Sequence, residues 1–560
     1  MKKSKFLSIL TISFLFSISS IAQSKPAVKK NLNINTKTTN VVAKKGNMSE
    51  LEIQSWPHMD IYTDSVPGMS LKKAYEFIAD KKGETVILAV IDSGIDIEHE
   101  DLKGLVWVNT KEIPNNGIDD DKNGYVDDIH GWNFLGSKKG NAYPEQLEMT
   151  RIVKKLKPRF EGKTAVQISD ADKKDFELYT KLSNEIKNRR EKAYENKVHY
   201  ESYKYSLKEA HQSIVDILKK EVYSIEELDS LGTVHEDLQP QLYNLMRIID
   251  GEGSIEQAFA YLDEGIAYFK EQYDTPNYDI NFDGRAIVGD NPDDFNDRNY
   301  GNNDVIGFKD KESHGTHVTG IAAALRNNGI GMNGITNNVK IMAIRAVPDG
   351  DEYDKDVALA IRYAVDNGAK VVNMSFGKSY STQKEWVFEA IKYAASKDVL
   401  LVHAAGNDAK NIDNEDNYPN DSEDKILEFA DNIITVGAST RNFNEDLVAR
   451  FSNYGKKNVD VFAPGLEIYS TFPNNTYEIS QGTSMASPQV AGLAVLIRSY
   501  YPKLKASEVK KIIMDSGIEV PFSVYLPGSN SEKVSFSNLS VSGKVVNAYN
   551  ALLLAQQKTK

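Results

Sequence analysis

Five short, mostly apolar runs constrain the fold of this chain more than any other feature. They lie at Val86–Ile91, Val339–Val347, Lys370–Met374, Val399–Ala404 and Ile433–Gly437. Runs of this length predict strands buried on both faces, as in a parallel sheet. Helical patterns lie between them at Asp356–Asn367 and Gln383–Ser396. The alternation predicts an α/β fold in which helices cover both faces of a mostly parallel sheet.

The stretch over residues 137–278 differs from the rest because charged residues are dense and apolar residues recur at helical spacing. Two series show this: Ile255, Phe259, Leu262, Ile266 and Phe269, and Leu207, Ala210, Ile214 and Ile217. Intervals of three and four predict amphipathic helices. We therefore expect a mostly helical insertion. Its apolar stripes are more often helix-packing surfaces than a binding site.

The first residues resemble an export signal. Three lysines precede an apolar run from Phe6 to Ile21, and small residues follow. This order is typical of a secretory signal peptide over residues 1–22, with a buried N-terminal helix as the alternative. Residues 23–50 are polar and predict a mobile linker or short pro-segment. We expect an exported protein that is periplasmic, cell-surface or extracellular.

The amino-acid composition argues against some classes of binding partner. The net charge of −13 argues against nucleic acid or an anionic membrane surface. After the signal, no apolar stretch reaches the roughly 18 residues that span a bilayer, so we expect no membrane span and a monomer. The chain has no cysteine. Disulfides and a thiol nucleophile are excluded, and stability after export must come from packing or bound ions.

An aspartate directly follows the first apolar run, in the sequence Asp92-Ser-Gly-Ile-Asp96. Open α/β sheets hold their sites at the carboxyl ends of parallel strands. Aspartates also end many strands simply by accepting backbone N–H groups in a turn. Asp92 is therefore a candidate site residue only in combination with others.

Two histidines lie in the run Ser313-His-Gly-Thr-His-Val-Thr-Gly320, where small and apolar residues predict a helix. A neutral imidazole is the usual general base at pH 7, and a ring at a helix start stays accessible. His314 and His317 share a helix face, which would also suit zinc, but no third ligand accompanies them. We interpret His314 as the base and His317 as a buried structural residue.

A serine opens a further apolar helix in the run Gln481-Gly-Thr-Ser-Met-Ala-Ser-Pro488. The preceding glycine permits a turn, and the helix start offers free N–H groups beside Ser484. Serine also begins helices merely as a cap. However, Asn407 ends another apolar strand in Ala404-Ala-Gly-Asn407, and an asparagine amide can donate to an oxyanion.

The motifs around Asp92, His314 and Ser484 resemble those of the subtilisin (subtilase) family of serine proteases, in the same Asp, His, Ser order. The resemblance covers residues 51–136 and 279–556, with the helical insertion between them. It implies a subtilisin-like fold and an exported serine endopeptidase that acts on protein or peptide substrates and needs no cofactor for its chemistry.

The resemblance also implies a role for each residue. Ser484 attacks the scissile carbonyl, His314 takes the proton, Asp92 orients the imidazole, and Asn407 helps to hold the oxyanion. A substrate chain binds as an added strand along one segment and lies against a wall of small residues. These candidate substrate-binding residues are Ser375, Phe376, Gly377, Ala405 and Gly406. Phe376 and the small residues Ala404, Ala405 and Gly406 favour an apolar or broad first pocket.

An alternative is a catalytically silent protein of the same fold that only binds peptides. The insertion falls between Asp92 and His314, on the active-site side of the sheet, so we also hypothesise that it roofs the cleft and restricts large substrates. Many subtilases carry a folded inhibitory propeptide, whereas the segment before Leu51 is short and polar.

Two acidic loops flank the insertion. Each places oxygen side chains at alternate positions before a glycine, as calcium loops do, and hard oxygen ligands favour a structural Ca²⁺ ion. The first departs from the EF-hand pattern because its twelfth position is His130. A pair of solvated turns is the alternative. The candidate ligands are Asp119, Asp121, Asn123 and Asp127 in the first loop and Asp279, Asn281, Asp283 and Asp290 in the second.

Overall fold

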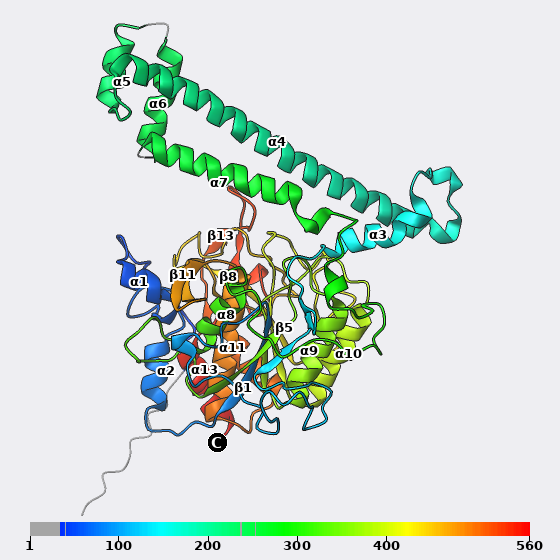
Figure 1. Cartoon of the computed structure of the whole chain (residues 1–560). Coiled ribbons are helices and arrows are strands. Elements are labelled where there is room, and N and C mark those ends of the chain that lie inside the picture. The colour runs from blue at the N-terminus through cyan, green and yellow to red at the C-terminus, as the bar shows by residue number, and fades with distance from the viewer. Residues whose placement is uncertain (1–33, 40, 236–237, 253) are drawn as a thin grey trace, which may run out of the picture.

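The computed structural model describes residues 34–39, 41–235, 238–252 and 254–560 (Figure 1). The predicted signal peptide, residues 1–22, lies outside these ranges, as does the first part of the predicted linker. The described chain forms a body of strands and helices, from which a group of long helices projects.

Nine strands form one sheet through the middle of the body. Every neighbouring pair is parallel except β12 with β15 at one edge. The predicted α/β fold is confirmed, and each of the five apolar runs forms a strand. In spatial order the strands are β12 (Ile518–Glu519), β15 (Lys544–Val545), β9 (Val461–Pro464), β8 (Ile433–Ser439), β7 (Leu400–Ala404), β6 (Val371–Met374), β1 (Val86–Asp92), β5 (Val339–Arg345) and β2 (Gly131–Asn133).

Helices cover both faces of this sheet. In β1, Leu88 and Val90 pack into the core on one face, whereas Ala89 and Ile91 pack into the core on the other. Successive side chains of a strand point to opposite faces, so a strand covered on both faces needs an unbroken apolar run. The first face carries α2 (Leu71–Ile78), α8 (His314–Ala323), α11 (Thr483–Tyr500), α12 (Ala506–Ser516) and α13 (Ala548–Lys558), and the second carries α9 (Asp354–Asp366) and α10 (Lys384–Ser396).

Strand β1 lies at the point where the strand order reverses. The chain passes from β1 to β2 and β5 on one side and then crosses to β6 on the other, from which β7, β8 and β9 continue outward. Such a reversal leaves a crevice beyond the carboxyl ends of the strands. Ile91 of β1 pairs with Met374 of β6, so Asp92 and Ser375, which follow them, meet at this crevice.

Short antiparallel pairs complete the body. They are β3 (Gly136–Ser137) with β4 (Gly140–Asn141), β10 (Ile468–Phe472) with β11 (Thr476–Ser480), and β13 (Ser523–Tyr525) with β14 (Lys533–Ser535). The short helix α1 (Glu50–Ser55) precedes the body. Ser70 precedes α2 in a left-handed conformation (φ 58°), and its side chain makes no cap bond. Ser70 therefore does not cap this helix, since a capping residue usually has extended backbone.

The later part of the predicted linker is held against the body. The Thr38 hydroxyl donates to the Glu519 carbonyl (2.6 Å), and the Glu519 amide donates to the Thr36 carbonyl (2.8 Å). Val41 and Ala43 pack against the core near β12. The mobility expected from composition is therefore wrong for this part of the segment, because backbone hydrogen bonds fix it without any large apolar cluster of its own.

The insertion consists of helices, as predicted. Figure 1 shows α4 and α7 running side by side away from α3, with α5 and α6 at their far end. We call α4 to α7 the arm. The bounds are α3 (Glu148–Phe160), α4 (Lys173–Leu218), α5 (Ile225–Gly232), α6 (Gln239–Glu252) and α7 (Ile255–Asp274).

Two separate apolar clusters stabilise the insertion. The distal cluster buries Leu207, Ile214 and Leu262, as their spacing predicts, whereas Ile217 from the same predicted series is 39% exposed. The proximal cluster joins α3 and the first turns of α4 to Tyr380 of the body. The apolar stripes thus pack helix against helix, and one of them also fixes the base of the arm.

Candidate active site

Asp92 and His314 are in direct contact at the crevice. Asp92 ends β1 and is 1% exposed, and its Oδ1 lies 2.7 Å from Nδ1 of His314, which begins α8. The Ser93 amide also donates to this oxygen (2.8 Å). The parallel sheet fixes the carboxylate and the helix start fixes the ring, so the pair is preorganised.

The ring of His314 keeps an open edge, since its side chain is 41% exposed. Desolvation lowers the pKa of His314, but the charge and hydrogen bond of Asp92 outweigh it, so the pKa lies above its usual value. His317 differs, because it is buried and its Nε2 lies 3.1 Å from the Glu478 carbonyl. Burial lowers the pKa of His317 to about 4, which fits the structural role predicted for it.

Ser484 lies in the first turn of α11, next to the end of β6. Its Oγ donates to the Ser375 carbonyl (3.1 Å), and the Ser375 hydroxyl donates back to the Ser484 carbonyl (2.9 Å). Over the described residues, no hydrogen bond joins His314 to Ser484. Gly482 precedes the helix with φ +150°, a conformation that side chains rarely adopt. The sharp turn that presents Ser484 therefore depends on this glycine.

The side chain of Asn407 has a fixed orientation. Its Oδ1 accepts hydrogen bonds from the Thr483 amide (2.9 Å) and the Thr483 hydroxyl (3.0 Å), and that hydroxyl accepts one from the Gly406 amide (3.0 Å). With the carbonyl oxygen occupied, the Nδ2 group remains as the donor. Asn407 and Ser484 both line the cleft described next.

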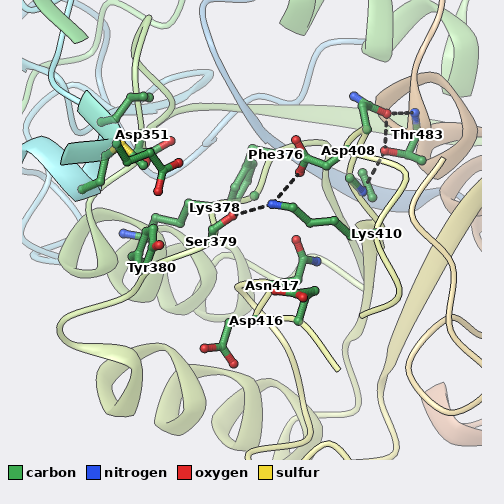
Figure 2. Close-up of a pocket in the computed structure, with 18 of the residues that line it drawn as sticks. Asp351, Phe376, Lys378, Ser379, Tyr380, Asp408, Lys410, Asp416, Asn417 and Thr483 are labelled. Carbon is green, nitrogen blue, oxygen red and sulfur yellow. Dashed lines mark hydrogen bonds and ion pairs between the residues drawn. The ribbon is translucent and has the colours of Figure 1, made fainter. Parts of the chain in front are cut away.

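A cleft of about 590 Å³ opens beside Ser484 (Figure 2). Phe376, Gly377 and Gly406 line it, as predicted, but Asp92 and His314 do not. Its walls in the body are formed by Asp351, Phe376, Gly377, Lys378, Ser379, Tyr380, Ala404, Gly406, Asn407, Asp408, Lys410, Glu415, Asp416, Asn417, Thr483 and Ser484.

Two predicted substrate-binding residues lie elsewhere. Ala405 is fully buried and packs in the core near Ile412, so Ala404 lines the cleft in its place. Side chains alternate in direction at the end of an extended strand, which accounts for this difference. Ser375 is 3% exposed and bonds to Ser484 instead of facing the cleft.

The site also depends on residues that the sequence motifs do not single out. Asn373 lies in β6, donates to the Ser375 hydroxyl (2.9 Å) and accepts from the Ser487 hydroxyl (2.9 Å). This network ties the start of α11 to the sheet. An asparagine inside an otherwise apolar, fully buried strand is the signal that points to it, because buried amides need partners.

The insertion forms part of the cleft wall. Leu147 and Met149 at the start of α3 and Lys181, Glu185 and Arg189 of α4 line it together with the body residues. The sequence hypothesis that the insertion roofs the cleft is thus replaced by a more specific finding. The base of the arm forms one side of the cleft.

Lys378 anchors the insertion beside the cleft. Its buried Nζ lies 3.1 Å from Glu148 of α3 and 2.9 Å from Asp354 of α9, and it donates to the Glu352 carbonyl (2.8 Å). Arg151 of α3 pairs with the same Glu148. The residue that follows Gly377 therefore also holds the base of the insertion.

The first predicted calcium loop brings together only some of its candidates. Carboxylate oxygens of Asp119 and Asp121 meet one from Glu112, all within 4.8 Å of one another. The sequence pattern does not include Glu112, which lies outside the loop. Asn123 and Asp127 are engaged by other groups, since Asn123 donates to Asp128 and Asp127 accepts from the amides of residues 116 and 117.

The second predicted loop does not form a comparable group. Asp279 accepts from the Asn281 amide (2.9 Å), and Asp283 precedes a short 3₁₀ turn. Asp290 is buried between Arg285 (2.7 Å) and Lys355 (2.7 Å), so both of its oxygens already contact cations. This geometry contradicts Asp290 as a calcium ligand. Two buried cations neutralise the charge that a metal would need.

Within the described ranges, no helix combines the length and apolarity needed to cross a bilayer.

Comparisons with known proteins agree with this geometry. The profile of the subtilase family of peptidases (family S8) matches residues 83–540, well over half of the chain. A thermophilic serine proteinase of Bacillus sp. (strain AK1) is 40% identical over 250 residues, covering 44% of this chain and 53% of that protein. Subtilisin DY of Bacillus licheniformis is 38% identical over 219 residues (39% and 74%).

A cell wall-associated protease of Bacillus subtilis (strain 168) is 36% identical over 214 residues, 38% of this chain and 22% of that protein. The match thus spans about half of the first relative's length and about a fifth of this one's. The profile match, which covers both halves of the body, identifies the family. The chain belongs to the subtilase family.

Proposed function

We propose that this protein is an exported serine endopeptidase that cleaves protein or peptide substrates through an acyl-enzyme intermediate. The observation that carries the proposal is the contact of 2.7 Å between Asp92 and His314. This contact lies at the crevice where Ser484 and Asn407 line one cleft. Family membership and the predicted signal peptide support activity and export, respectively.

In the proposed mechanism, Ser484 Oγ turns from the Ser375 carbonyl to His314 Nε2 and attacks the scissile carbonyl. His314 takes the proton and later gives it to the leaving amine. Asp92 accepts the Nδ1–H of His314, which leaves Nε2 free to act as the base and stabilises the imidazolium. The raised pKa of His314 fits this role, since Asp92 favours the charged form of the ring.

The oxyanion is held by the Asn407 Nδ2 group and the Ser484 backbone N–H. Thr483 fixes the amide of Asn407 before the reaction begins, so little reorganisation is needed when charge develops. The substrate chain adds as a strand along residues 375–377. In the described structure the backbone of Gly377 makes no hydrogen bond, so its groups are available to a peptide.

The test compares wild type with Ser484→Ala for cleavage of denatured casein and for labelling by a fluorophosphonate. Ser213→Ala, on the exposed side of the arm, is the matched control. We expect cleavage and labelling in wild type and in the control, and neither in Ser484→Ala. A folded wild type that is neither labelled nor active would contradict the proposal.

One observation favours the silent, peptide-binding alternative: Ser484 Oγ is bonded to the Ser375 carbonyl and not to His314. A serine held in this way would not be activated. The two candidates differ in labelling, because a peptide-binding protein of this fold would bind an extended peptide without reacting with the fluorophosphonate.

We also propose a structural calcium ion at Glu112, Asp119 and Asp121. Carboxylate oxygens of the three residues lie within 4.8 Å of one another, and hard oxygen donors suit Ca²⁺. One cation of the chain, the exposed Lys111, lies 3.9 Å from Asp121. The ion would brace the loop before β2 and take no part in the chemistry. A ligand at 100 times its dissociation constant stabilises by about 2.7 kcal/mol.

The inactive Ser484→Ala protein allows the melting temperature to be measured without self-digestion. We expect EDTA to lower it and Ca²⁺, but not Mg²⁺, to restore it. Asp119→Asn should remove this response, and Asp290→Asn should leave the response to calcium in place. A melting temperature that is independent of both chelator and calcium would exclude the site.

A further inference from the structure

We propose that the face of α4 that carries Lys181, Glu185 and Arg189 belongs to the substrate-binding site. We further propose that it favours substrates with an acidic side chain where the bound chain passes this face. The inference rests on the proposed function, which it deepens by naming the substrate class.

The spacing of these residues places them on one face. They follow one another at intervals of four, and residues four apart in a helix are neighbours on its surface. All three line the cleft that Ser484 also lines. A chain lying along Phe376 and Gly377 therefore has the sheet on one side and this face of α4 within the same cavity.

The face is held firmly in position. Leu182 and Ile186, one residue after Lys181 and Glu185, are buried in the proximal cluster with Met149 of α3. Tyr380, two residues after Lys378, packs against the same cluster. Lys378 also pairs with Glu148 at the start of α3, so a polar contact fixes α3, and the apolar cluster fixes α4, beside the segment on which we expect substrates to bind.

The charge balance of the face is positive. Arg189 lies 2.7 Å from Glu185, so these two charges offset each other. Lys181 has no carboxylate within 4.0 Å among the described residues, and its Nζ contacts only the Tyr380 ring (5.8 Å to the centroid). An ammonium group at the rim of a peptide-binding cleft attracts a substrate carboxylate.

The neighbouring charges do not cancel Lys181. Asp351 accepts a hydrogen bond from the Glu148 amide (2.7 Å), and its burial raises its pKa, which disfavours its charged form. Near Ser484, by contrast, charged side chains of the cleft are paired with one another or with their neighbours. Lys410 reaches towards Asp408 and Ser379 across the cleft (Figure 2), and Asp416 pairs with Lys425. The positive end of the cleft is thus the end formed by the insertion.

The test uses a set of fluorescent peptides that share one sequence, with a single Glu or a single Gln moved through each position. Dissociation constants are measured by fluorescence polarisation with the inactive Ser484→Ala protein. We expect one position, or two adjacent ones, at which Glu binds about two- to fivefold more tightly than Gln, the range for an exposed ion pair.

The Lys181→Glu change in the same background should remove or reverse this preference. The matched control is Lys208→Glu, which makes the same charge change on the same helix roughly 40 Å further along. It should keep the preference. Added salt should weaken the preference in the parent protein, because exposed charges are screened.

The outcomes separate the inference from the proposed function, because cleavage of the same peptides by wild type is measured in parallel. Equal binding of Glu and Gln peptides at every position, or a preference that survives Lys181→Glu, overturns the inference alone. Binding with the expected preference but without any cleavage supports the inference and contradicts the proposed protease. Absence of both binding and cleavage overturns both.

Discussion

Asp92 is a buried carboxylate whose two oxygens differ in their hydrogen bonding. Oδ1 contacts His314 and the Ser93 amide, whereas Oδ2 is buried without a hydrogen-bond partner in the described structure. An unsatisfied buried carboxylate oxygen is costly. We infer that the fold tolerates this cost because the carboxylate orients the imidazole and stabilises its charged form.

Replacing Asp92 by Asn tests this role. The amide cannot hold the ring in the tautomer that leaves Nε2 free, so kcat should fall about 10⁴-fold. The acidic limb of kcat/KM should also move. In wild type we expect its midpoint above the usual pKa of histidine, since Asp92 raises the pKa of His314 and the neutral base is lost as the pH falls through that pKa.

Asp92→Asn removes the carboxylate that raises the pKa of His314, whereas the desolvation that lowers this pKa remains. The midpoint of the residual activity should therefore lie at a lower pH than that of wild type. The pH profile is followed with a short chromogenic peptide at constant ionic strength. A midpoint that does not move would show that Asp92 has no electrostatic effect on His314.

Asn407 allows a second test at the same scale. Asn407→Ala removes the side-chain oxyanion donor, and one such donor contributes about 10²–10³ in turnover in serine proteases of this family. We expect kcat to fall by that factor with KM little changed, because the donor acts on the transition state. Thr483→Val, which only orients the amide, should cost less. A fall in KM alone would argue against the assignment.

At the scale of single residues, the sequence motifs implied that two distant side chains meet, and the structure brings these two together. The contact between Asp92 and His314 joins residues 222 positions apart, as the motifs implied. Prediction failed where only the direction of a side chain decides. Ala405 and Ala404 are identical in chemistry, and the twist at the end of β7 sends one to the core and the other to the cleft.

At the scale of elements, one buried ion pair fixes the approach to α8. Arg345 ends β5 and is fully buried, and it forms three hydrogen bonds to Glu312, two residues before His314. It also donates to Asn133 at the end of β2 (3.0 Å). The pair therefore positions the segment from which α8 begins.

Glu312→Gln should destabilise the protein by about 3–5 kcal/mol, because it leaves the Arg345 guanidinium buried without a carboxylate. The measurement is urea unfolding in the inactive Ser484→Ala background. Glu389→Gln is the control, since it removes an exposed pair with Lys392 and should change stability by less than about 1 kcal/mol. Equal effects of the two changes would mean that Arg345 relaxes into solvent.

The strands and helices of the body were predictable because burial on both faces leaves an unmistakable apolar run. The order of residues 34–39 was not, because it depends on hydrogen bonds to β12, a strand nearly 500 residues away in sequence. Backbone pairing of this kind has no compositional signature. The prediction of Asp290 as a calcium ligand was wrong for a related reason. The sequence of an acidic loop is the same whether a metal ion or two basic side chains neutralise its charge.

At the scale of the whole molecule, the arm divides into two parts with different contacts. The proximal cluster joins the base of the arm to the body, whereas the distal cluster contains only residues of the arm. The rings of Tyr200 and Phe269 lie 5.3 Å apart between α4 and α7, so a short loop can join these positions. The distal part is therefore removable without disturbing the cleft.

Deleting residues 201–268 and joining the ends with a glycine-rich loop tests what the distal part does. We expect unchanged kcat/KM for short peptides, because Lys181, Glu185 and Arg189 remain. Cleavage of folded proteins should rise relative to that of peptides if the distal arm obstructs bulky substrates. An unchanged ratio of the two rates would show that the distal arm has no gating effect.

The insertion's helical nature was readable from sequence, but its relation to the cleft was not. Helical periodicity shows which residues pack and gives no information on where the packed unit docks. That information depends on Glu148, Arg151 and Lys378, whose pairing joins segments more than 200 positions apart. Single charged residues in a chain rich in charge give no sign of such a pairing.

Lys378 limits how freely this architecture can be recombined. Its backbone follows the segment on which we expect substrates to bind, and its ammonium group is shared between α3 of the insertion and α9 of the body. Grafting the insertion onto a relative without this lysine and its carboxylates would leave Glu148 buried beside Arg151 alone. The insertion is therefore not a portable module, and a functional transplant must carry the strand end, the lysine and both acidic partners as one unit.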